Sequence, residues 1–363
     1  MPEPPAPEPT TTERARGAAA RALGRLPAPL QDALADALPG GPAPSVDGQR
    51  LDPATRLLLA LNPGGAGDAA SVRADPAGAR ARLRREVLGL AGRPTAVGHV
   101  QDLVVGGAAG PLDARLYRPA RAERPPLVVY FHGGGYTQGD LDTHDEPCRL
   151  LCRQAGHAVL SVGYRLAPEA RFPAAVEDAE AAFRWARDHA QRLGADPARV
   201  AVGGDSAGGA LAAVTAQAVR PDGPVAQLLI YPSADHPTPR PSRALFDGYI
   251  LPDALRRAYF DVYTRGTGVA DEDPRLSPIY GRLDGLAPAF VVTAGFDVLR
   301  DEGEAYAHAL RDAGGAVALY RQATLPHGFV NLTSASPAAW RATVAVARRW
   351  RRFVAEHAAG GAA

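Results

Sequence analysis

The amino-acid sequence predicts an α/β fold, with a mostly parallel, doubly wound sheet flanked by helices and covered in part by a helical cap. Residues 126–131 form a continuous apolar run, which is typical of a strand that is buried on both faces. After this run, predicted helices and strands alternate, as they do in sheets with helical crossovers. Between residues 235 and 280 the alternation stops and aromatic residues gather, which indicates an insertion that covers a site.

Residues 1–48 are predicted to be a disordered, proline-rich tail. Ten of the first 44 residues are proline, a composition that disfavours a packed core. A short helix over 13–26 is the one element expected there, and its arginine-rich face does not suit a membrane anchor. Residues 49–92 carry leucine-rich segments at 57–61 and 79–90, which predict two helices ahead of the sheet.

Residues 93–363 are predicted to form the main domain, with the insertion at 235–280 inside it. Residues 99–105 and 112–117 flank a glycine-rich turn, a pattern that predicts an antiparallel hairpin. Further strands are expected at 126–131, 158–164, 199–202, 225–231, 289–294 and 317–320, and helices at 145–154, 175–193 and 207–219.

The last helix is predicted to begin at Ser336-Pro337, where a capping residue precedes proline at the first helical position. Its apolar residues recur at helical spacing, so one side of the helix forms a continuous stripe. We expect this stripe to face the sheet: Trp340, Val344, Ala347, Trp350 and Val354.

Composition and charge exclude several classes of protein. Lys plus Arg number 40 and Asp plus Glu 39, so no charge bias favours nucleic acid or a membrane surface. No apolar run reaches the roughly 18 residues of a membrane-spanning helix, and the N-terminus lacks a signal-peptide pattern, so we expect a cytoplasmic protein. Cys148 and Cys152 lie four residues apart in a predicted helix, which suits buried thiols rather than a disulfide or a zinc site.

The segment Val200–Leu211 joins a predicted strand to a predicted helix through Gly204-Asp205-Ser206-Ala207-Gly208, an instance of G-x-S-x-G. A serine at such a sharp turn is held in a strained backbone conformation with its hydroxyl exposed above the sheet. The flanking glycines leave room for the neighbouring strand and helix. A glycine-serine turn without chemistry is the alternative, and the strand before and the helix after Ser206 favour a nucleophile.

A second glycine-rich segment, Phe131-His132-Gly133-Gly134-Gly135-Tyr136, follows the apolar strand. Consecutive glycines let backbone N–H groups point at one spot, as an oxyanion hole requires. With this pair of motifs, and with Tyr164–Glu169 and Phe172-Pro173-Ala174 between them, the chain resembles the bacterial hormone-sensitive-lipase-like (family IV) esterases of the α/β-hydrolase superfamily. The resemblance extends from about Leu51 to the C-terminus and implies an α/β-hydrolase fold.

In this fold an acid and then a histidine follow the nucleophilic serine along the chain. His327 is the expected base for Ser206, because it lies in a loop beyond the predicted strand 317–320. His308 and His357 fall within predicted helices and are expected to be surface or packing residues.

Two aspartates compete for the role of the acid after strand 289–294. Asp297 lies close to the end of the strand, where the acid belongs, and is the one we favour. Asp301 is placed to cap the next helix, with Glu304 three residues on as its capping-box partner. The family often has Asp-Pro-Leu here, and Val298 replaces that proline.

The resemblance implies a carboxylesterase that cleaves esters of short to medium acyl chains through an acyl-enzyme on Ser206. The N–H groups of Gly133, Gly134 and Ala207 are expected to hold the oxyanion, while His132 shapes the loop. Neither a metal nor an organic cofactor is implied, and the expected partner is a small ester rather than nucleic acid. The family often pairs through its last strand and helix, so a homodimer is also consistent with the resemblance.

By the same resemblance, residues 49–92 and 235–280 form a cap over the pocket. We expect the substrate pocket to be lined by Tyr136, Asp205, Phe246, Tyr249 and Phe329. Two alternatives stay open. In the first, the same triad cuts an amide, a carbamate or a lactone instead of an ester. In the second, the chain is a ligand-binding relative without activity, like the plant hormone receptors that have lost the catalytic histidine. The presence of His327 argues against this second alternative.

Overall fold

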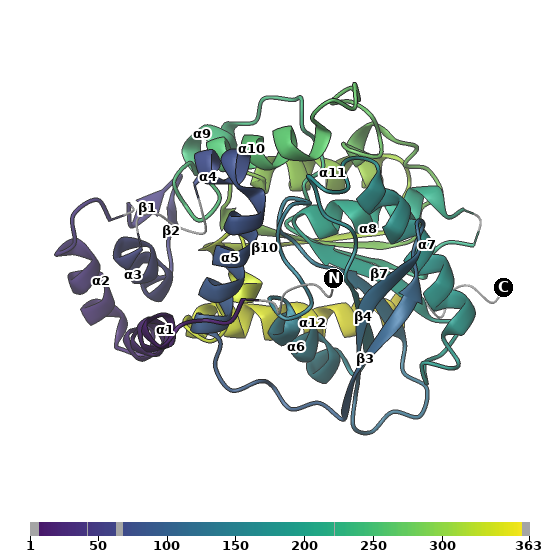
Figure 1. Cartoon of the computed structure of the whole chain (residues 1–363), viewed down its shortest axis with the longest axis horizontal. Coiled ribbons are helices and arrows are strands. Elements are labelled where there is room, and N and C mark those ends of the chain that lie inside the picture. Colours follow the sequence, from purple (N-terminus) through teal and green to yellow (C-terminus); the bar gives the residue numbers. More distant parts are fainter. Residues whose placement is uncertain (1–6, 42, 63–67, 221, 358–363) are drawn as a thin grey trace.

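The computed structural model describes residues 7–41, 43–62, 68–220 and 222–357, and its centre is one eight-stranded sheet (Figure 1). The strand order is β10-β9-β8-β7-β5-β6-β4-β3, and the pairs from β10 to β6 are parallel while β4 pairs antiparallel with both β6 and β3. The predicted mostly parallel sheet is therefore confirmed. The strands span His99–Gly106 (β3), Pro111–Arg118 (β4), Leu127–Phe131 (β5), Ala158–Val162 (β6), Val200–Asp205 (β7), Gln227–Ile230 (β8), Ala289–Phe296 (β9) and Val317–Pro326 (β10).

Helices cover both faces of the sheet, as the unbroken burial of its central strands requires. Leu127, Val129 and Phe131 of β5 share one apolar cluster with α7, α8 and α11. Val128 and Tyr130 point the other way and share a second cluster with α6 and α12. These helices span Asp145–Ala155 (α6), Ala174–His189 (α7), Ala207–Ala218 (α8), Arg300–Asp312 (α11) and Pro337–His357 (α12).

The register between β5 and β7 brings the two glycine-rich motifs together. Phe131 at the end of β5 lies opposite Gly204 of β7, so the segment that begins at His132 starts next to the G-x-S-x-G turn. Both segments leave the sheet at its carboxyl edge, where ligand sites of parallel sheets form. The sheet itself thus positions the site.

Helices from two parts of the chain lie over this edge. The first group is α4 (Ala69–Ala74) and α5 (Pro76–Leu90), and the second is α9 (Pro241–Leu245) and α10 (Asp253–Thr264). Arg73 on α4 donates to Asp261 on α10 at 2.7 Å, which joins the two groups. The side chain of Arg84 on α5, only 9% exposed, pairs with Asp140 at 2.6 Å and with Asp142, which ties α5 to the loop after the His-Gly-Gly-Gly segment.

The short helix expected over 13–26 is present as α1 (Thr11–Leu23). The predicted disorder of the rest of residues 1–48 is wrong for residues 28–36, which form α2 (Ala28–Asp36). Thr10 and Glu13 form a capping box at the start of α1. Gly17 lets α1 approach α5 closely, since a Cβ there would lie 1.9 Å from Gly89 O. Arg21 then donates to the last carbonyl groups of α5, at 2.9 to 3.2 Å.

Some of the described prolines fall at helix starts, where a missing N–H costs little. Pro29 lies in the first turn of α2, and Pro53 is the first residue of α3 (Pro53–Leu61). Arg56 on α3 is nearly buried and forms ion pairs with Asp32 and Asp36 on α2. A small hairpin, β1 (Ser45–Val46) and β2 (Gln49–Arg50), precedes α3. Residues 7–62 therefore pack on the domain where the structure describes them.

The apolar stripe of α12 is buried at Val344, Ala347, Trp350 and Val354. Trp340 is the exception, because its side chain is 44% exposed. It lies in the first turn of α12, beside α1 and the segment after α5, and lines a surface hollow there with Arg21 and Arg25. The helical period was correct, but the first turn extends past the apolar core.

Candidate active site

Ser206 occupies the turn between β7 and α8 with φ 56° and ψ −121°, a conformation that is strained for a residue with a side chain. Close packing explains the glycines on both sides of it. A Cβ at Gly204 would lie 2.3 Å from Gly208 O, and one at Gly208 would lie 1.9 Å from Phe131 O. The Ser206 N–H donates to Ile230 O of β8 at 2.8 Å, which anchors the turn to the sheet.

The structure brings Ser206, His327 and Asp297 together in one line of hydrogen bonds. His327 Nε2 lies 2.9 Å from Ser206 Oγ, and His327 Nδ1 lies 2.8 Å from Asp297 Oδ2. The second oxygen of Asp297 accepts from Leu299 N at 2.8 Å, which fixes the carboxylate. The His327 ring lies against Tyr231, with ring centroids 4.6 Å apart. This arrangement can pass a proton from the serine hydroxyl to the imidazole.

Asp301, the competing acid, lies elsewhere. Its carboxylate accepts from Ser242 N at 2.8 Å and from Arg300 Nε at 2.8 Å, so it holds α9. The predicted helix cap at Asp301 is wrong: α11 already begins at Arg300, after a turn in which Asp297 accepts from Leu299. Glu304, the expected capping partner, pairs with Arg321 instead.

Backbone N–H groups line the space in front of Ser206, but one predicted donor is engaged. Gly133 N donates to Asp205 Oδ1 at 3.0 Å, so the expectation that Gly133 supplies an oxyanion hydrogen bond is wrong. The loop instead folds so that Gly134 O accepts from Thr137 N and Gln138 N. Within the described chain, the N–H groups of Gly134, Gly135 and Ala207 have no partner, and all three residues border the cavity.

Asp205 lines the cavity as expected, and its buried carboxylate also accepts hydrogen bonds from within the protein. It accepts from Tyr130 Oη at 2.8 Å and from Gly133 N, and it lies 3.5 Å from His144 Nε2. Burial acts to raise the pKa of Asp205, but His144 and Tyr130 outweigh burial, and the pKa is lowered. A buried carboxylate that stays ionised can hold the glycine loop in place.

His132 stabilises the same loop from the other side. Its Nδ1 lies 2.8 Å from Gly133 O, and its ring stacks on Tyr164 with centroids 4.4 Å apart. Burial, and then the neighbouring His144, lower the pKa of His132 to about 4. The imidazole is therefore neutral at physiological pH and supports the loop rather than acting as a base.

The cavity beside Ser206 has a volume of about 120 Å³. Its apolar walls come from both helical groups of the cap: Leu83, Val87, Ile250, Leu251, Leu255, Tyr259 and Phe260. Tyr136 lines this cavity as expected.

Phe246, Tyr249 and Phe329 do not line the cavity, so those predictions are wrong. Phe246 and Tyr249 pack in a separate cluster with Leu51 and Phe296. Phe329 packs edge-on against Tyr231 beneath the histidine loop. Tertiary packing around Leu51 and β9 turns these aromatic side chains away.

His236 also lines the cavity, and we did not single it out from the sequence. It follows β8 at the carboxyl edge of the sheet, a position that could have marked it. Its Nε2 lies 3.4 Å from Ser233 Oγ, and its ring lies against Phe260 with centroids 4.2 Å apart. Burial lowers its pKa to about 3, and nearby arginines add to the effect. His236 therefore offers a neutral polar group in the wall.

Comparisons with known proteins agree with this geometry. Residues 128–331 match the protein family described as alpha/beta hydrolase fold. The chain is 46% identical over 322 residues to the carboxylic ester hydrolase LipN of Mycobacterium tuberculosis, covering 86% of this chain and 84% of that protein. It is 44% identical over 254 residues to the esterase LipI of the same organism, covering 67% of this chain and 79% of that protein.

Solved structures give the same result. The chain matches the hyperthermophilic esterase of the archaeon Pyrobaculum calidifontis with a TM-score of 0.71 and 39% identity, covering 78% of this chain and 95% of that chain. It matches an α/β hydrolase from the metagenome of Lake Arreo with a TM-score of 0.76 and 38% identity, covering 83% and 96% of the two chains.

The chain therefore belongs to the α/β-hydrolase fold family. Within that superfamily it is a carboxylesterase-like hydrolase of the hormone-sensitive-lipase-like group, as the His-Gly-Gly-Gly and G-x-S-x-G segments predicted. In the part of the chain that the structure describes, no helix has the length and apolar character needed to cross a membrane.

Proposed function

We propose that the protein hydrolyses carboxylic esters of small molecules, with Ser206 as nucleophile, His327 as base and Asp297 as the acid that orients it. The observation that carries this proposal is the line of hydrogen bonds from Asp297 through His327 to Ser206 at a strained turn. The relatives named as ester hydrolases support the choice of bond.

In the proposed mechanism, Ser206 Oγ attacks the ester carbonyl while His327 Nε2 takes the hydroxyl proton. Asp297 holds His327 Nδ1–H and stabilises the imidazolium. The tetrahedral oxyanion is held by the N–H groups of Gly134, Gly135 and Ala207. His327 returns the proton to the leaving alcohol, and water activated by the same histidine then releases the acid.

The size and lining of the cavity support short to medium acyl chains. A volume of about 120 Å³ is well below the roughly 300–1,000 Å³ of pockets for drug-sized ligands. Its apolar walls exclude water and hold the hydrocarbon part of an ester. Cytoplasmic location and dimerisation stay predictions from the sequence and its resemblance.

Ester hydrolysis is tested with Ser206→Ala and a series of p-nitrophenyl esters from acetate to laurate. We expect kcat to fall by roughly 10³–10⁶-fold in the variant, since the hydroxyl is the bond-forming atom. A fluorophosphonate should label the wild type and not the variant, and matching thermal melts would show that both are folded. Near-normal turnover by a folded Ser206→Ala protein would refute the mechanism.

A further inference from the structure

A second hollow lies at the opposite end of the strands that carry the site. Pro126, His157 and Arg199 immediately precede β5, β6 and β7, and all three line this hollow. Its volume is about 1200 Å³. Because Ser206 and the glycine loop follow the carboxyl ends of β7 and β5, the hollow is separated from them by the length of the strands.

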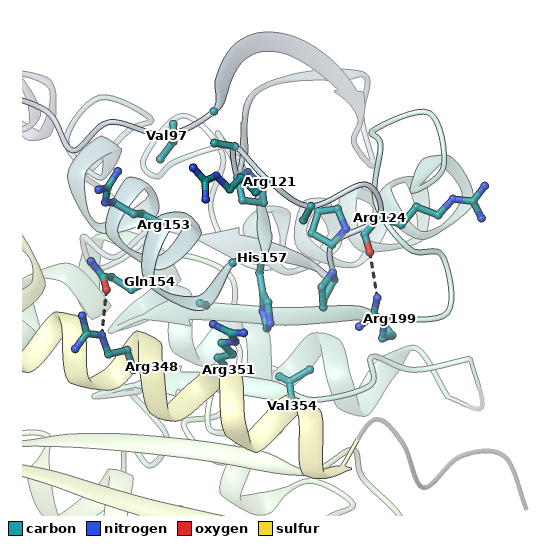
Figure 2. Close-up of a pocket in the computed structure, with 18 of the residues that line it drawn as sticks. Val97, Arg121, Arg124, Arg153, Gln154, His157, Arg199, Arg348, Arg351 and Val354 are labelled. Atoms are coloured by element: carbon teal, nitrogen blue, oxygen red, sulfur yellow. Dashed lines mark hydrogen bonds between the residues drawn. The ribbon is translucent and has the colours of Figure 1, made fainter.

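Arginines from four different parts of the chain surround the hollow (Figure 2). They come from the loop before β5, from α6, from the residue before β7 and from α12: Arg121, Arg124, Arg153, Arg199, Arg348 and Arg351. Among the described residues that line it, none is an aspartate or a glutamate. The chain as a whole has a formal charge of only +1, so this concentration of positive charge is local.

Little within the protein neutralises these guanidinium groups. In the described part of the chain only Arg199 pairs with a carboxylate, that of Asp196 at 2.6 Å. Arg153 donates to Ala96 O at 2.9 Å, and Arg348 donates to Gln154 Oε1 at 3.1 Å, which is drawn as a dashed line in Figure 2. Both acceptors are uncharged, so these two hydrogen bonds do not offset the repulsion between the cations of the hollow.

His157 also lines the hollow. Its side chain is 4% exposed, and its Nδ1 has no hydrogen-bond partner in the described structure. The ring lies edge-on to Trp350, with centroids 6.3 Å apart. Burial, with Arg199 and Arg351 adding to it, lowers the pKa of His157 to about 4.

We propose that this hollow binds a small molecule that carries a di- or triphosphate group. The planar forks of several arginines match the oxygens of a phosphate chain and can bind them two at a time. Arg124 points away from the hollow, but Arg121, Arg153, Arg348 and Arg351 lie together on one side of it (Figure 2). Because these four come from three elements around a concave surface, the geometry fits a compact polyanion better than a flat bilayer or an extended nucleic acid. Apolar side chains such as Val97 and Val354 offer a surface for an attached group.

Isothermal titration calorimetry with ATP, inorganic triphosphate and adenosine tests this proposal. We expect one saturable site for ATP and for triphosphate, weakened by salt, and none for adenosine. Equal affinities would identify the phosphate chain as the whole ligand, and tighter binding of ATP would place its nucleoside on the apolar wall.

Neighbouring residues of α12 supply a matched pair of variants. Arg351 lines the hollow and Arg352 does not, and both side chains are exposed. Arg351→Gln should weaken triphosphate binding by about tenfold, the loss of one charge-assisted contact, while Arg352→Gln leaves it within twofold. Equal losses in both variants would mean only a general charge effect and would overturn the proposal.

A second control separates the hollow from the proposed active site. Protein labelled on Ser206 with a fluorophosphonate should bind triphosphate as well as unlabelled protein does, because the two sites lie at opposite ends of the strands. Loss of binding after labelling, no saturable binding, or binding only of anionic vesicles or DNA would each overturn the proposal. The titration needs no esterase activity, so it stands or fails independently of the proposed function.

Discussion

At the carboxyl end of the sheet, buried acids and bases face each other, whereas at the amino end six arginines share one carboxylate. Asp297 faces His327, and Asp205 lies beside His144. Nearby, Glu302 on α11 pairs with Arg243 at 2.8 Å. The same strands therefore support two different sites. At the carboxyl end, acidic and basic side chains of the protein pair with one another, whereas at the amino end most of the arginines have no carboxylate partner among the described residues.

The largest effect is expected from a substitution in the proposed triad, at the carboxyl end of the sheet. Asp297→Asn should lower kcat by about 10⁴-fold, because an amide favours the wrong tautomer of the histidine. Asp301→Asn is the matched control: it can still accept from Ser242 N, so kcat should change only slightly. Ester kinetics on both folded variants make the measurement. A reversed ranking would assign the acid role to Asp301.

A smaller effect is expected at the buried ion pair beside the cavity. Glu302 is 1% exposed and also accepts from Ala234 N at 3.0 Å. Glu302→Gln should lower the free energy of unfolding by about 3 kcal/mol, because it leaves the Arg243 charge without its partner. Glu304→Gln breaks a more exposed pair with Arg321 and should cost less than about 1 kcal/mol. Similar urea midpoints for the two variants would contradict this contrast.

Low pH should lower the stability of the protein, because neutral histidines are buried at both ends of the sheet. Burial lowers the pKa of His132 and His157 to about 4 and that of His236 to about 3. The unfolded chain takes up these protons first, near its ordinary pKa of about 6.5, so stability falls as the pH drops from there toward 4. Each histidine contributes at most about 1.4 kcal/mol per pH unit. Burial raises the pKa of Glu302, Glu86 and Glu180, which act in the opposite direction, but these carboxyl groups start from lower ordinary pKa values than histidine.

Urea unfolding at pH 7, 6 and 5 measures this dependence. His157→Gln should make the fall in stability with acid shallower, and the same change at the exposed His99 should leave the slope as it is. Unfolding midpoints that are the same at pH 5 and pH 7 would be incompatible with three buried neutral histidines.

The smallest effect is expected from removing charge at the amino end. The double variant Arg348→Gln, Arg351→Gln removes two exposed positive charges from the arginines around the hollow. The free energy of unfolding should change by less than about 0.5 kcal/mol. Any gain should be largest at low salt, where repulsion between the remaining arginines is least screened. Thermal melts at two salt concentrations test it. A loss as large as that expected for Glu302→Gln would mean that these arginines are structural.

Local signals in the sequence predicted the sheet, the strained serine and the histidine loop, since each depends on neighbouring residues. Contacts between distant residues were not predictable. The Gly133–Asp205 hydrogen bond joins residues 72 positions apart, and it removed one expected oxyanion donor. Phe246 and Tyr249 have the composition of a pocket wall, but Phe296 and Leu51 draw them into another cluster. In the N-terminal region, the helix over 13–26 was predicted, but α2 was missed because it is held by contacts with α3, such as the ion pair between Asp32 and Arg56.

The register of β5 against β7 has a consequence for protein design. Phe131 stands opposite Gly204, so the glycine loop and the nucleophile leave adjacent strands that are about 4.8 Å apart. The hydrogen bond between Gly133 and Asp205 then locks one segment to the other. A design that transplants this site should therefore keep the two segments on neighbouring parallel strands in this register, together with the β8 carbonyl that accepts from Ser206 N.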